Sequence, residues 1–456
     1  MRQSRRAFLA TVGAVGLAGC AGVGGRNDPG VVTPTDGTDA GTDVATGAET
    51  DAATSGETDA TTAGAPDTGT STSTPAGRTG TASVPRTDVG DRLEGFEDLE
   101  YWYALSDQGT VEPELEGVYA GSQSMRLRAS GDDAFAGAFT SFGEPRDFDG
   151  KNVSLAVKVR APAIAKLSVA LLAPDESNMV RMTRTFPGPV GTWVRSDMGV
   201  TAVRGDPDLS AVQEVRLVAR RRDQDDAAID VSVDDVRLAD APDAGSVTFT
   251  FDDTHESHYE TAFPLMEEYG FSGVEGVISD AVYRGDRLDV GMMREMSDAG
   301  WDMASHPYVG EKLLTESSAA KQRSVIEGNK RFLVDKGFEA GARHFLTPKN
   351  MVGPATMRIV RDVHDSLYTF GGMPNGRPAT TDYYNSRIAA ANTDRVRQYV
   401  DYAAEFGQHL VLNHHAIGAE AGEISESDFA ALLEYVDGAD VNVVTCSDVL
   451  APQGQH

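Results

Sequence analysis

The stretch that decides the fold is residues 247–253, Val-Thr-Phe-Thr-Phe-Asp-Asp, an apolar run that ends in two adjacent carboxylates. A short run of β-branched and aromatic residues predicts a buried parallel strand. In α/β folds, polar residues at the C-terminal end of such a strand are placed for catalysis. Asp252 and Asp253 are therefore the first candidate catalytic residues, although aspartate after a strand is also a common turn residue.

Beyond this strand the sequence alternates between short apolar segments and amphipathic ones. The expected strands are residues 273–278, 302–305, 344–346, 367–370, 409–413 and 441–445. The expected helices are residues 259–269, 290–299, 317–336, 354–364, 394–406 and 425–436. This alternation predicts a parallel βα fold, either an open sheet or a slightly short barrel. Of nine histidines, eight lie between His255 and His415, which indicates a functional site in this region.

Residues 90–241 have a different texture, with short segments of period-two alternation such as 153–159 separated by Gly, Pro and Asp turns. This pattern predicts an antiparallel β-sandwich. Its last segment, residues 231–238, resembles the final strand of jelly-roll carbohydrate-binding modules. That resemblance implies a possible structural calcium ion, with ligands among Glu97, Asp98, Asp234 and Asp235.

The N-terminus carries export signals. Residues 4–9, Ser-Arg-Arg-Ala-Phe-Leu, resemble a twin-arginine motif, and the apolar segment that follows is too short to span a bilayer. Residues 17–20, Leu-Ala-Gly-Cys, resemble a lipobox in which the Cys20 thiol receives a lipid. We therefore expect residues 1–20 to direct export by the twin-arginine route and to anchor the protein on the outer face of the cell membrane.

Residues 21–88 consist mainly of Thr, Gly, Ala, Asp and Ser, and they contain almost no large apolar side chain. Such a segment cannot bury enough apolar surface to offset its chain entropy, which predicts a disordered linker. The predicted domains are thus the signal, this linker, a β-sandwich over 90–241 and a catalytic domain over 245–452.

The charge is strongly acidic, at −30, with 70 acidic and 40 basic residues. This charge argues against nucleic acid as a partner, because the phosphate backbone would be repelled. Only eight of the basic residues are lysine, which resembles proteins from high-salt environments, although codon bias is an alternative explanation. The two cysteines, Cys20 and Cys446, lie in different contexts, so we expect no disulfide, and we expect Cys446 to be a buried inert thiol.

The sequence from Thr250-Phe251-Asp252-Asp253 through the segment that leads into His306 resembles the polysaccharide deacetylases of the NodB-homology type. The resemblance extends over about 245–450 and implies a distorted (β/α) barrel. It also implies that Asp252 is the general base for a metal-bound water and that Asp253 is a ligand of the metal, usually zinc.

The second motif of that family supplies two histidines four residues apart. His306 matches the first, but Gly310 stands at the second position and cannot ligate. Zinc hydrolases normally use about three protein ligands, so two ligands alone predict weak binding. His255 or His258 could supply the missing imidazole, although surface or supporting roles for both histidines are equally open.

The third and last motifs add further candidates. Residues 343–350 resemble the family motif in which a proline, here Pro348, closes the groove. The arginine that steadies the catalytic aspartate is absent there, so this role is either lost or taken by Arg387. Residues 410–418 end a strand in His414 and His415, and the resemblance implies that one of them protonates the leaving amine.

The leading prediction is an exported, lipid-anchored, metal-dependent deacetylase that acts on N-acetylated amino sugars of a surface or extracellular polysaccharide. The sandwich would hold the enzyme on the polymer. One alternative is a catalytically inactive glycan-binding lipoprotein with the same fold, for which Gly310 is the strongest argument. Another is hydrolysis of a different C–N or ester bond on the same scaffold.

Overall fold

The computed structural model describes residues 89–222, 227–308, 310, 312–391, 393–418 and 424–450. The predicted signal with Cys20 and the predicted linker over 21–88 lie outside the described residues. Within the described ranges, no helix combines the length and the apolar character that a membrane span requires.

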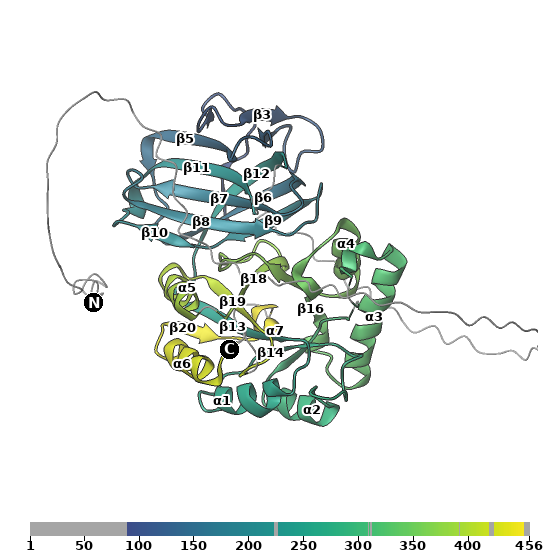
Figure 1. Ribbon diagram of the computed structural model, residues 1–456. Helices are drawn as coiled ribbons and strands as arrows, with labels where there is room; N and C mark the ends of the chain where they lie inside the picture. Colours follow the sequence, from purple (N-terminus) through teal and green to yellow (C-terminus); the bar gives the residue numbers. More distant parts are fainter. Residues whose placement is uncertain are drawn as a thin grey trace, which may run out of the picture. The chain divides into compact units, whose positions relative to one another are not determined.

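Residues 91–240 form two six-stranded antiparallel sheets (Figure 1). The first contains β3 (Thr110–Glu114), β4 (Ser124–Ala129), β12 (Ile229–Asp240), β6 (Lys151–Ala161) and β9 (Trp193–Met198), with β1 (Asp91–Glu94) paired to β12. The second contains β10 (Ala202–Arg204), β8 (Met179–Phe186), β7 (Ala165–Leu172), β11 (Val212–Arg221), β5 (Phe135–Arg146) and β2 (Tyr103–Ala104). The predicted β-sandwich is confirmed.

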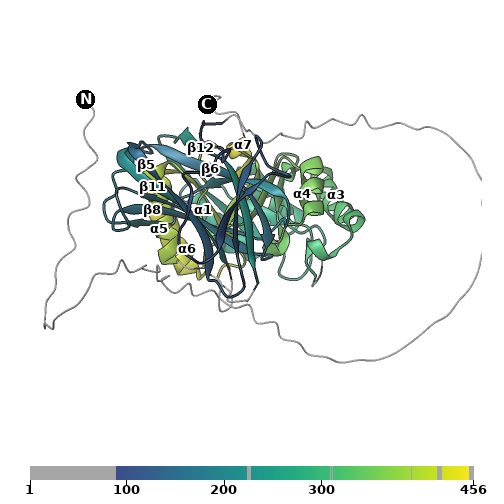
Figure 2. The same cartoon turned by 90° about the horizontal axis from the view of Figure 1, so that it is seen from above.

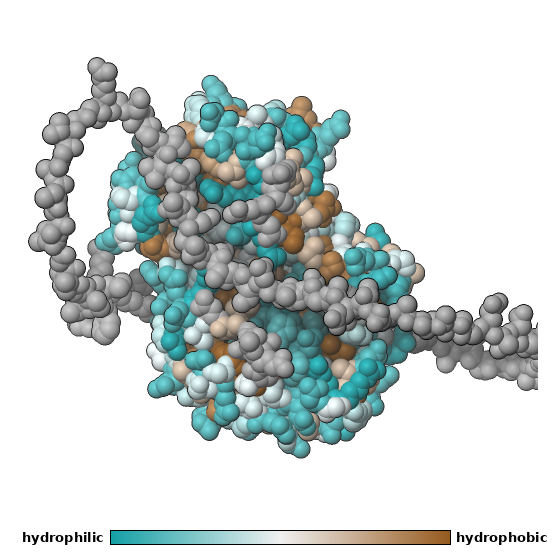
Figure 3. Space-filling view, viewed as in Figure 1, coloured by the Kyte–Doolittle hydropathy of each residue, from teal (hydrophilic) through white to brown (hydrophobic). Residues whose placement is uncertain are grey.

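The period-two alternation explains the sandwich. Along β11, Val215, Leu217 and Ala219 are buried, whereas Arg216 between them remains partly exposed. One face of each sheet therefore contributes to the core, and the other carries polar side chains. Hydrophilic residues dominate the face of the molecule seen in Figure 3.

The C-terminal part is a closed barrel of seven parallel strands. Around the barrel they are β13 (Gly245–Asp252), β14 (Val274–Val277), β15 (Asp302–Ser305), β16 (His344–Leu346), β17 (Ser366–Phe370), β18 (Tyr383–Ala389) and β19 (His409–His414). Strand β13 closes the barrel, because it pairs with both β14 and β19. A short β20 (Val441–Val443) pairs with the start of β13. The barrel, rather than an open sheet, is thus the observed form of the predicted βα fold.

Helices surround the barrel, and α3 packs against α4 while α5 packs against α6 (Figures 1 and 2). The helices are the short π-helix η2 (His258–Ala262), α1 (Phe263–Glu267), α2 (Val290–Asp298), α3 (Ala319–Asp335), α4 (Pro354–Val363), α5 (Thr393–Phe406), α6 (Glu426–Asp437) and α7 (Cys446–Leu450). Four short 3-10 turns are η1 (Leu209–Ala211), η3 (Leu314–Glu316), η4 (Gly341–Arg343) and η5 (Pro348–Asn350).

Two elements differ from the sequence-based expectation. Strand β18 was not predicted, because its centre carries Asn385, Ser386 and Arg387, polar side chains that the barrel buries. The strand expected over 441–445 ends earlier, at Val443, and Cys446 begins α7. Its thiol lies in a buried cluster with barrel residues such as Leu346 and Val411, and burial raises its pKa, as expected for an inert thiol.

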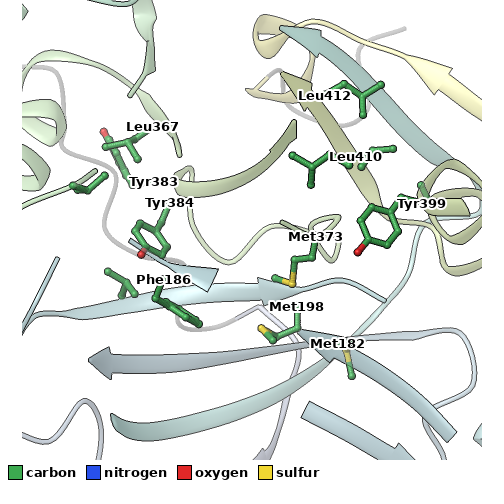
Figure 4. Packing of buried hydrophobic residues seen from close by; sticks show 14 of the residues in the cluster. Met182, Phe186, Met198, Leu367, Met373, Tyr383, Tyr384, Tyr399, Leu410 and Leu412 are labelled. Atoms are coloured by element: carbon green, nitrogen blue, oxygen red, sulfur yellow. The ribbon is translucent and has the colours of Figure 1, made fainter. Parts of the chain in front are cut away.

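The sandwich also contacts the barrel through buried polar and apolar groups. Gln408, just before β19, donates from Nε2 to Asn152 Oδ1 at 2.9 Å and accepts from Val200 N at 2.9 Å. The Asp197 carboxylate accepts a 3.0 Å hydrogen bond from Thr380 N, in the segment that leads into β18. Figure 4 shows apolar side chains from both parts in the same packed layer.

Tyr384 is the centre of these contacts. It sits at a bulge in β18, where the register against β17 shifts, and its φ of 90° is strained for an L-residue. Arg184 donates to the Tyr384 carbonyl, the Tyr384 hydroxyl donates to Gly188 O, and the Phe186 ring stacks at 6.0 Å. Sandwich residues therefore hold a strained position three residues before Arg387.

Two of the four predicted calcium ligands of the sandwich, Asp234 and Asp235, already have other partners. Asp234 accepts hydrogen bonds from Tyr119 N, Ala120 N and the Ser124 hydroxyl, donors that a calcium site would have to displace. Asp235 pairs with three guanidinium groups. In the part of the chain that is described, no three His, Cys, Asp or Glu side chains converge as a metal site.

We predict that EGTA leaves the Tm of the protein unchanged within about 2 °C at constant salt, because arginines rather than calcium neutralise Asp235. Replacement of Asp235 by Asn should lower the free energy of unfolding by about 3–5 kcal/mol, since it removes one partner of buried ion pairs. Thermal unfolding followed by circular dichroism measures both effects. A large EGTA-induced fall in Tm that added calcium reverses would contradict this assignment.

Candidate active site

The two carboxylates that end β13 lie on a strained turn. Asp253 has φ 78° and Thr254 has φ 63°, and a β-branched residue rarely adopts a positive φ. The turn is held by Ile278 N, which donates to Thr254 Oγ1 at 2.8 Å, and by Arg287 Nη1, which donates to Asp253 O at 3.1 Å. The side chain of Asp253 remains 39% exposed, whereas that of Asp252 is buried.

Asp252 forms a buried ion pair with Arg387. Arg387 Nη1 lies 2.9 Å from Asp252 Oδ1 and also 2.9 Å from Asn413 Oδ1. Burial alone would raise the pKa of Asp252, but Arg387, His306 and His415 together hold that pKa below its ordinary value. Asp252 is therefore ionised at neutral pH, as a general base must be. The structure places Arg387 where it can steady Asp252.

Two neighbouring features leave room for this pair and orient it. Gly276 lies beside Asp252, and a Cβ at that position would come within 2.9 Å of Asp252 Oδ1. Pro348 is buried at the start of η5, which continues through left-handed Lys349 and Asn350. This turn brings Asn350 Oδ1 to 3.1 Å from Arg387 Nη2. Pro348 thus belongs to the turn that fixes the guanidinium.

Asp253 and His306 form the second close pair. His306 Nδ1 donates to Leu346 O at 3.0 Å, which leaves Nε2 directed at Asp253 Oδ1, 3.3 Å away. Burial lowers the pKa of His306, but Asp252 and Asp253 raise it more, so the net shift is upward. The pKa of Asp253 is held well below its ordinary value, because His306 outweighs burial.

This donor set fits a divalent ion bound through two protein ligands, one carboxylate and one imidazole. It does not make a zinc site with three protein ligands. Gly310, at the position of the expected second histidine, has φ 73°, and no atom of the described residues lies within 4 Å of the point where a Cβ would stand. Among the described residues, no third His, Cys, Asp or Glu joins Asp253 and His306.

The two histidines proposed as replacement ligands do not complete the site. His258 is fully buried, and its two ring nitrogens contact Glu275 Oε2 at 2.8 Å and His415 O at 2.9 Å, so neither is available to a metal. The idea that His258 is a ligand is therefore wrong for this conformation. His255 is half-buried, and burial, together with His258 and Arg287, lowers its pKa to about 4. His255 is thus a neutral imidazole near Asp253, outside any three-ligand group.

The structure separates His414 from His415. The His414 ring is buried among Phe249, Phe251 and Phe429, with centroid distances of 5.1–6.0 Å. Neither of its ring nitrogens has a hydrogen-bond partner among the described residues, and burial lowers its pKa to about 3. His414 is therefore poorly placed to donate a proton.

His415 follows β19 at the exposed rim of the barrel. Its charge lowers the pKa of both Asp252 and Asp253, which places it within electrostatic reach of the two carboxylates. Of the two predicted candidates for the general acid, His415 is the one that is exposed and that acts electrostatically on Asp252 and Asp253, and its role stays a prediction.

Sequence reasoning missed three residues that shape the site: Asn350, Asn413 and Glu275. Asn350 and Asn413 both accept from Arg387, and buried Glu275 bonds His258 behind the site. Asn413 had a usable signal, because a polar residue near the end of an apolar strand points to a barrel interior. Glu275 had none, since a lone glutamate in a short strand resembles a surface residue.

Residues 239–363 match the family model described as polysaccharide deacetylase. The matched stretch includes Asp252, Asp253 and His306 but ends before Arg387 and His415. A search of curated proteins finds no match.

Among solved structures, the chain resembles the Xyl-CE4 domain of a multidomain xylanase from the hindgut metagenome of Trinervitermes trinervoides, with 16% identity and a TM-score of 0.35. This likeness covers 47% of the chain and 93% of that domain. A family 4 carbohydrate esterase from Streptomyces lividans shows 15% identity and a TM-score of 0.33, over 44% of this chain and 91% of that one.

The chain also resembles the family 11 carbohydrate-binding module of the Clostridium thermocellum cellulase Lic26A-Cel5E. The identity is 14% and the TM-score 0.26, over 33% of this chain and 95% of that module. Because these scores are low, the architecture rests on the strand pairing described above.

We predict that Gly310→His tightens zinc binding at least tenfold, because it adds an imidazole four residues from His306. Gly310→Ala, which places a Cβ on the same left-handed backbone without a donor, is the matched control. Isothermal titration with zinc measures the effect. Wild-type protein that already binds zinc as tightly as the histidine variant would show that another group completes the site.

We predict that Arg387→Gln lowers, at least tenfold, the kcat of the reaction in which Asp252 acts as the base. The same change should move the acidic limb of the pH–rate profile to higher pH. The sign follows from the ion pair: without the guanidinium, burial raises the pKa of Asp252, and the base is protonated at pH values where it was ionised. Arg343→Gln, which breaks the exposed pair with Asp365, is the control. An unshifted acidic limb would exclude Asp252 as the titrating base.

Proposed function

We propose that this protein is a hydrolase that removes N-acetyl groups from the amino sugars of a surface or extracellular polysaccharide. The carrying observation is the ionised, buried Asp252, paired with Arg387 and adjacent to the Asp253–His306 pair at the carboxyl ends of the barrel strands. The polysaccharide deacetylase match over residues 239–363 supports deacetylation as the reaction class.

In this proposal Asp252 accepts the proton of a water whose oxygen attacks the acetyl carbonyl carbon. Arg387 keeps Asp252 ionised and fixes its orientation. His415 donates a proton to the amine nitrogen as the C–N bond breaks, and the products are acetate and the free amino sugar. A divalent ion, when bound by Asp253 and His306, supplies polarisation of the carbonyl and a lower pKa of the water.

The proposed reaction depends on a divalent metal ion that the protein binds weakly. Because the described residues supply only two ligands, we propose a loosely held ion that is gained from solution rather than a permanently bound zinc. Zinc is the first candidate, since the ligands are one carboxylate and one imidazole.

The location and the role of the sandwich complete the proposal. We propose export by the twin-arginine route, lipidation of Cys20 and residence on the outer face of the cell membrane of a halophilic organism. The sandwich would bind the same glycan and raise the local substrate concentration at the barrel.

A second candidate function has its own supporting observation. His306 and Asp253 can satisfy each other as a hydrogen-bonded pair at 3.3 Å, and Gly310 offers no ligand. A protein with this pair in place of a metal could bind glycans without turnover.

Acetate release from a chitooligosaccharide in molar salt, with added zinc, tests the proposal. Wild-type protein should release acetate, and Asp252→Asn should lower the rate by about 100-fold or more, because it removes the general base. Asp298→Asn, at an exposed position at the end of α2, is the control and should retain full activity. No acetate from the wild type, with glycan binding intact, would establish the non-catalytic alternative.

A further inference from the structure

A buried acid–imidazole pair lies behind the candidate site, on the side of the barrel wall that faces the helices. Glu275 is in β14, His258 begins η2, and both side chains are fully buried. His258 Nδ1 lies 2.8 Å from Glu275 Oε2, and His258 Nε2 lies 2.9 Å from the backbone oxygen of His415. The pair thus joins the strand β14 to the loop after β19.

The chemistry of these contacts fixes the protons. A backbone carbonyl only accepts hydrogen bonds, so His258 Nε2 must carry a hydrogen and donate it to His415 O. One further proton lies between His258 Nδ1 and Glu275 Oε2, and the pair is either an ion pair or two neutral groups. In the neutral form Glu275 selects the tautomer of His258 that carries its hydrogen on Nε2, and in both forms Nε2 donates to the carbonyl of His415.

The register across three strands shows why this contact reaches the site. Phe251 of β13 is the register partner of both Glu275 in β14 and His414 in β19. Phe251 stacks on the His414 ring at 5.1 Å, and its ring lies 5.3 Å from that of His258. The end of β19 is therefore packed against Phe251 through His414, and the next carbonyl, that of His415, is hydrogen-bonded by His258.

A second hydrogen bond holds the same loop. Ser257, the neighbour of His258, accepts at Oγ from Ile417 N at 3.0 Å. The side chains of residues 257 and 258 thus form hydrogen bonds with the backbone of residues 417 and 415, on either side of Ala416. The other carboxylate oxygen, Glu275 Oε1, is buried and has no hydrogen-bond partner among the described residues. Burying an oxygen without a partner costs free energy, so a pair that served stability alone would not be expected to contain one.

We propose that Glu275 and His258 are positioning residues that hold the backbone of His415, and with it the His415 side chain, at the end of β19 beside the strand that ends in Asp252. This inference rests on the proposed function only in giving His415 the role of general acid. The hydrogen-bonded restraint on residues 415–417 is a property of the chain whether or not it catalyses the reaction.

The test compares four variants of the full-length protein. His258→Leu and Glu275→Leu remove the restraint. Glu275→Gln preserves it, because the amide can donate to Nδ1 of a neutral His258 that still donates from Nε2. His364→Leu is the matched control: His364 is also buried and also contacts a backbone carbonyl, Ala342 O at 3.0 Å, but it lies at the end of α4.

Hydrogen–deuterium exchange gives a readout that does not depend on activity. We expect the amides of residues 415–418 to exchange at least tenfold faster in His258→Leu and Glu275→Leu than in the wild type. In Glu275→Gln and His364→Leu they should exchange at the wild-type rate. Exchange of this segment that is unchanged in His258→Leu, or equally fast in His364→Leu, would overturn the proposal.

Kinetics give the second readout. We expect kcat for acetate release to fall at least tenfold in His258→Leu, with KM within about threefold of wild type, and to recover in Glu275→Gln. If the wild type releases no acetate but the exchange pattern is as expected, the positioning stands and the proposed function fails. Full kcat in His258→Leu together with faster exchange would overturn the positioning of His415 as an acid.

Discussion

The ion pair between Asp252 and Arg387 is the interaction on which the rest of the barrel mouth depends. A carboxylate buried inside a barrel is costly unless a counter-charge and hydrogen-bond donors compensate it, and one guanidinium supplies both here. The same group reaches Asn413 and Asn350. A single side chain therefore links the ends of β13 and β19 and the turn η5 to β18, in addition to the backbone pairing of the strands.

The position of that side chain depends in turn on contacts outside the barrel. Arg387 follows the strained bulge at Tyr384, and the bulge is held by Arg184, Phe186 and Gly188 of the sandwich. Strained backbone persists where the surroundings determine it fully. The sandwich thus contributes to the geometry of the candidate site through the backbone of β18, in addition to any glycan that it binds.

The sequence allowed the broad architecture to be predicted, since period-two segments and strand–helix alternation are local signals. Asp252, Asp253 and His306 were candidates because each ends or follows an apolar run, and the structure brings their side chains together. Strand β18 was missed for a physical reason: Asn385, Ser386 and Arg387 are buried by the barrel, and burial of polar residues is a tertiary effect.

Two questions about the site lay beyond the sequence. His414 and His415 could not be separated, because a one-residue shift of a strand end moves a side chain to the opposite face. The availability of His258 as a ligand depended on Glu275, which is 17 residues away and joins it only through the pairing of β13 with β14.

The contacts of Arg184 have a consequence for how such a chain can diverge. This guanidinium is fully buried, and it donates to the Ser196 hydroxyl and to a barrel carbonyl, both of which are uncharged. A sandwich exchanged for another by recombination would leave Tyr384 without its donor, and a barrel transferred alone would expose the same strained residue to water. The two halves are therefore expected to be inherited together, as one evolutionary unit rather than as interchangeable modules.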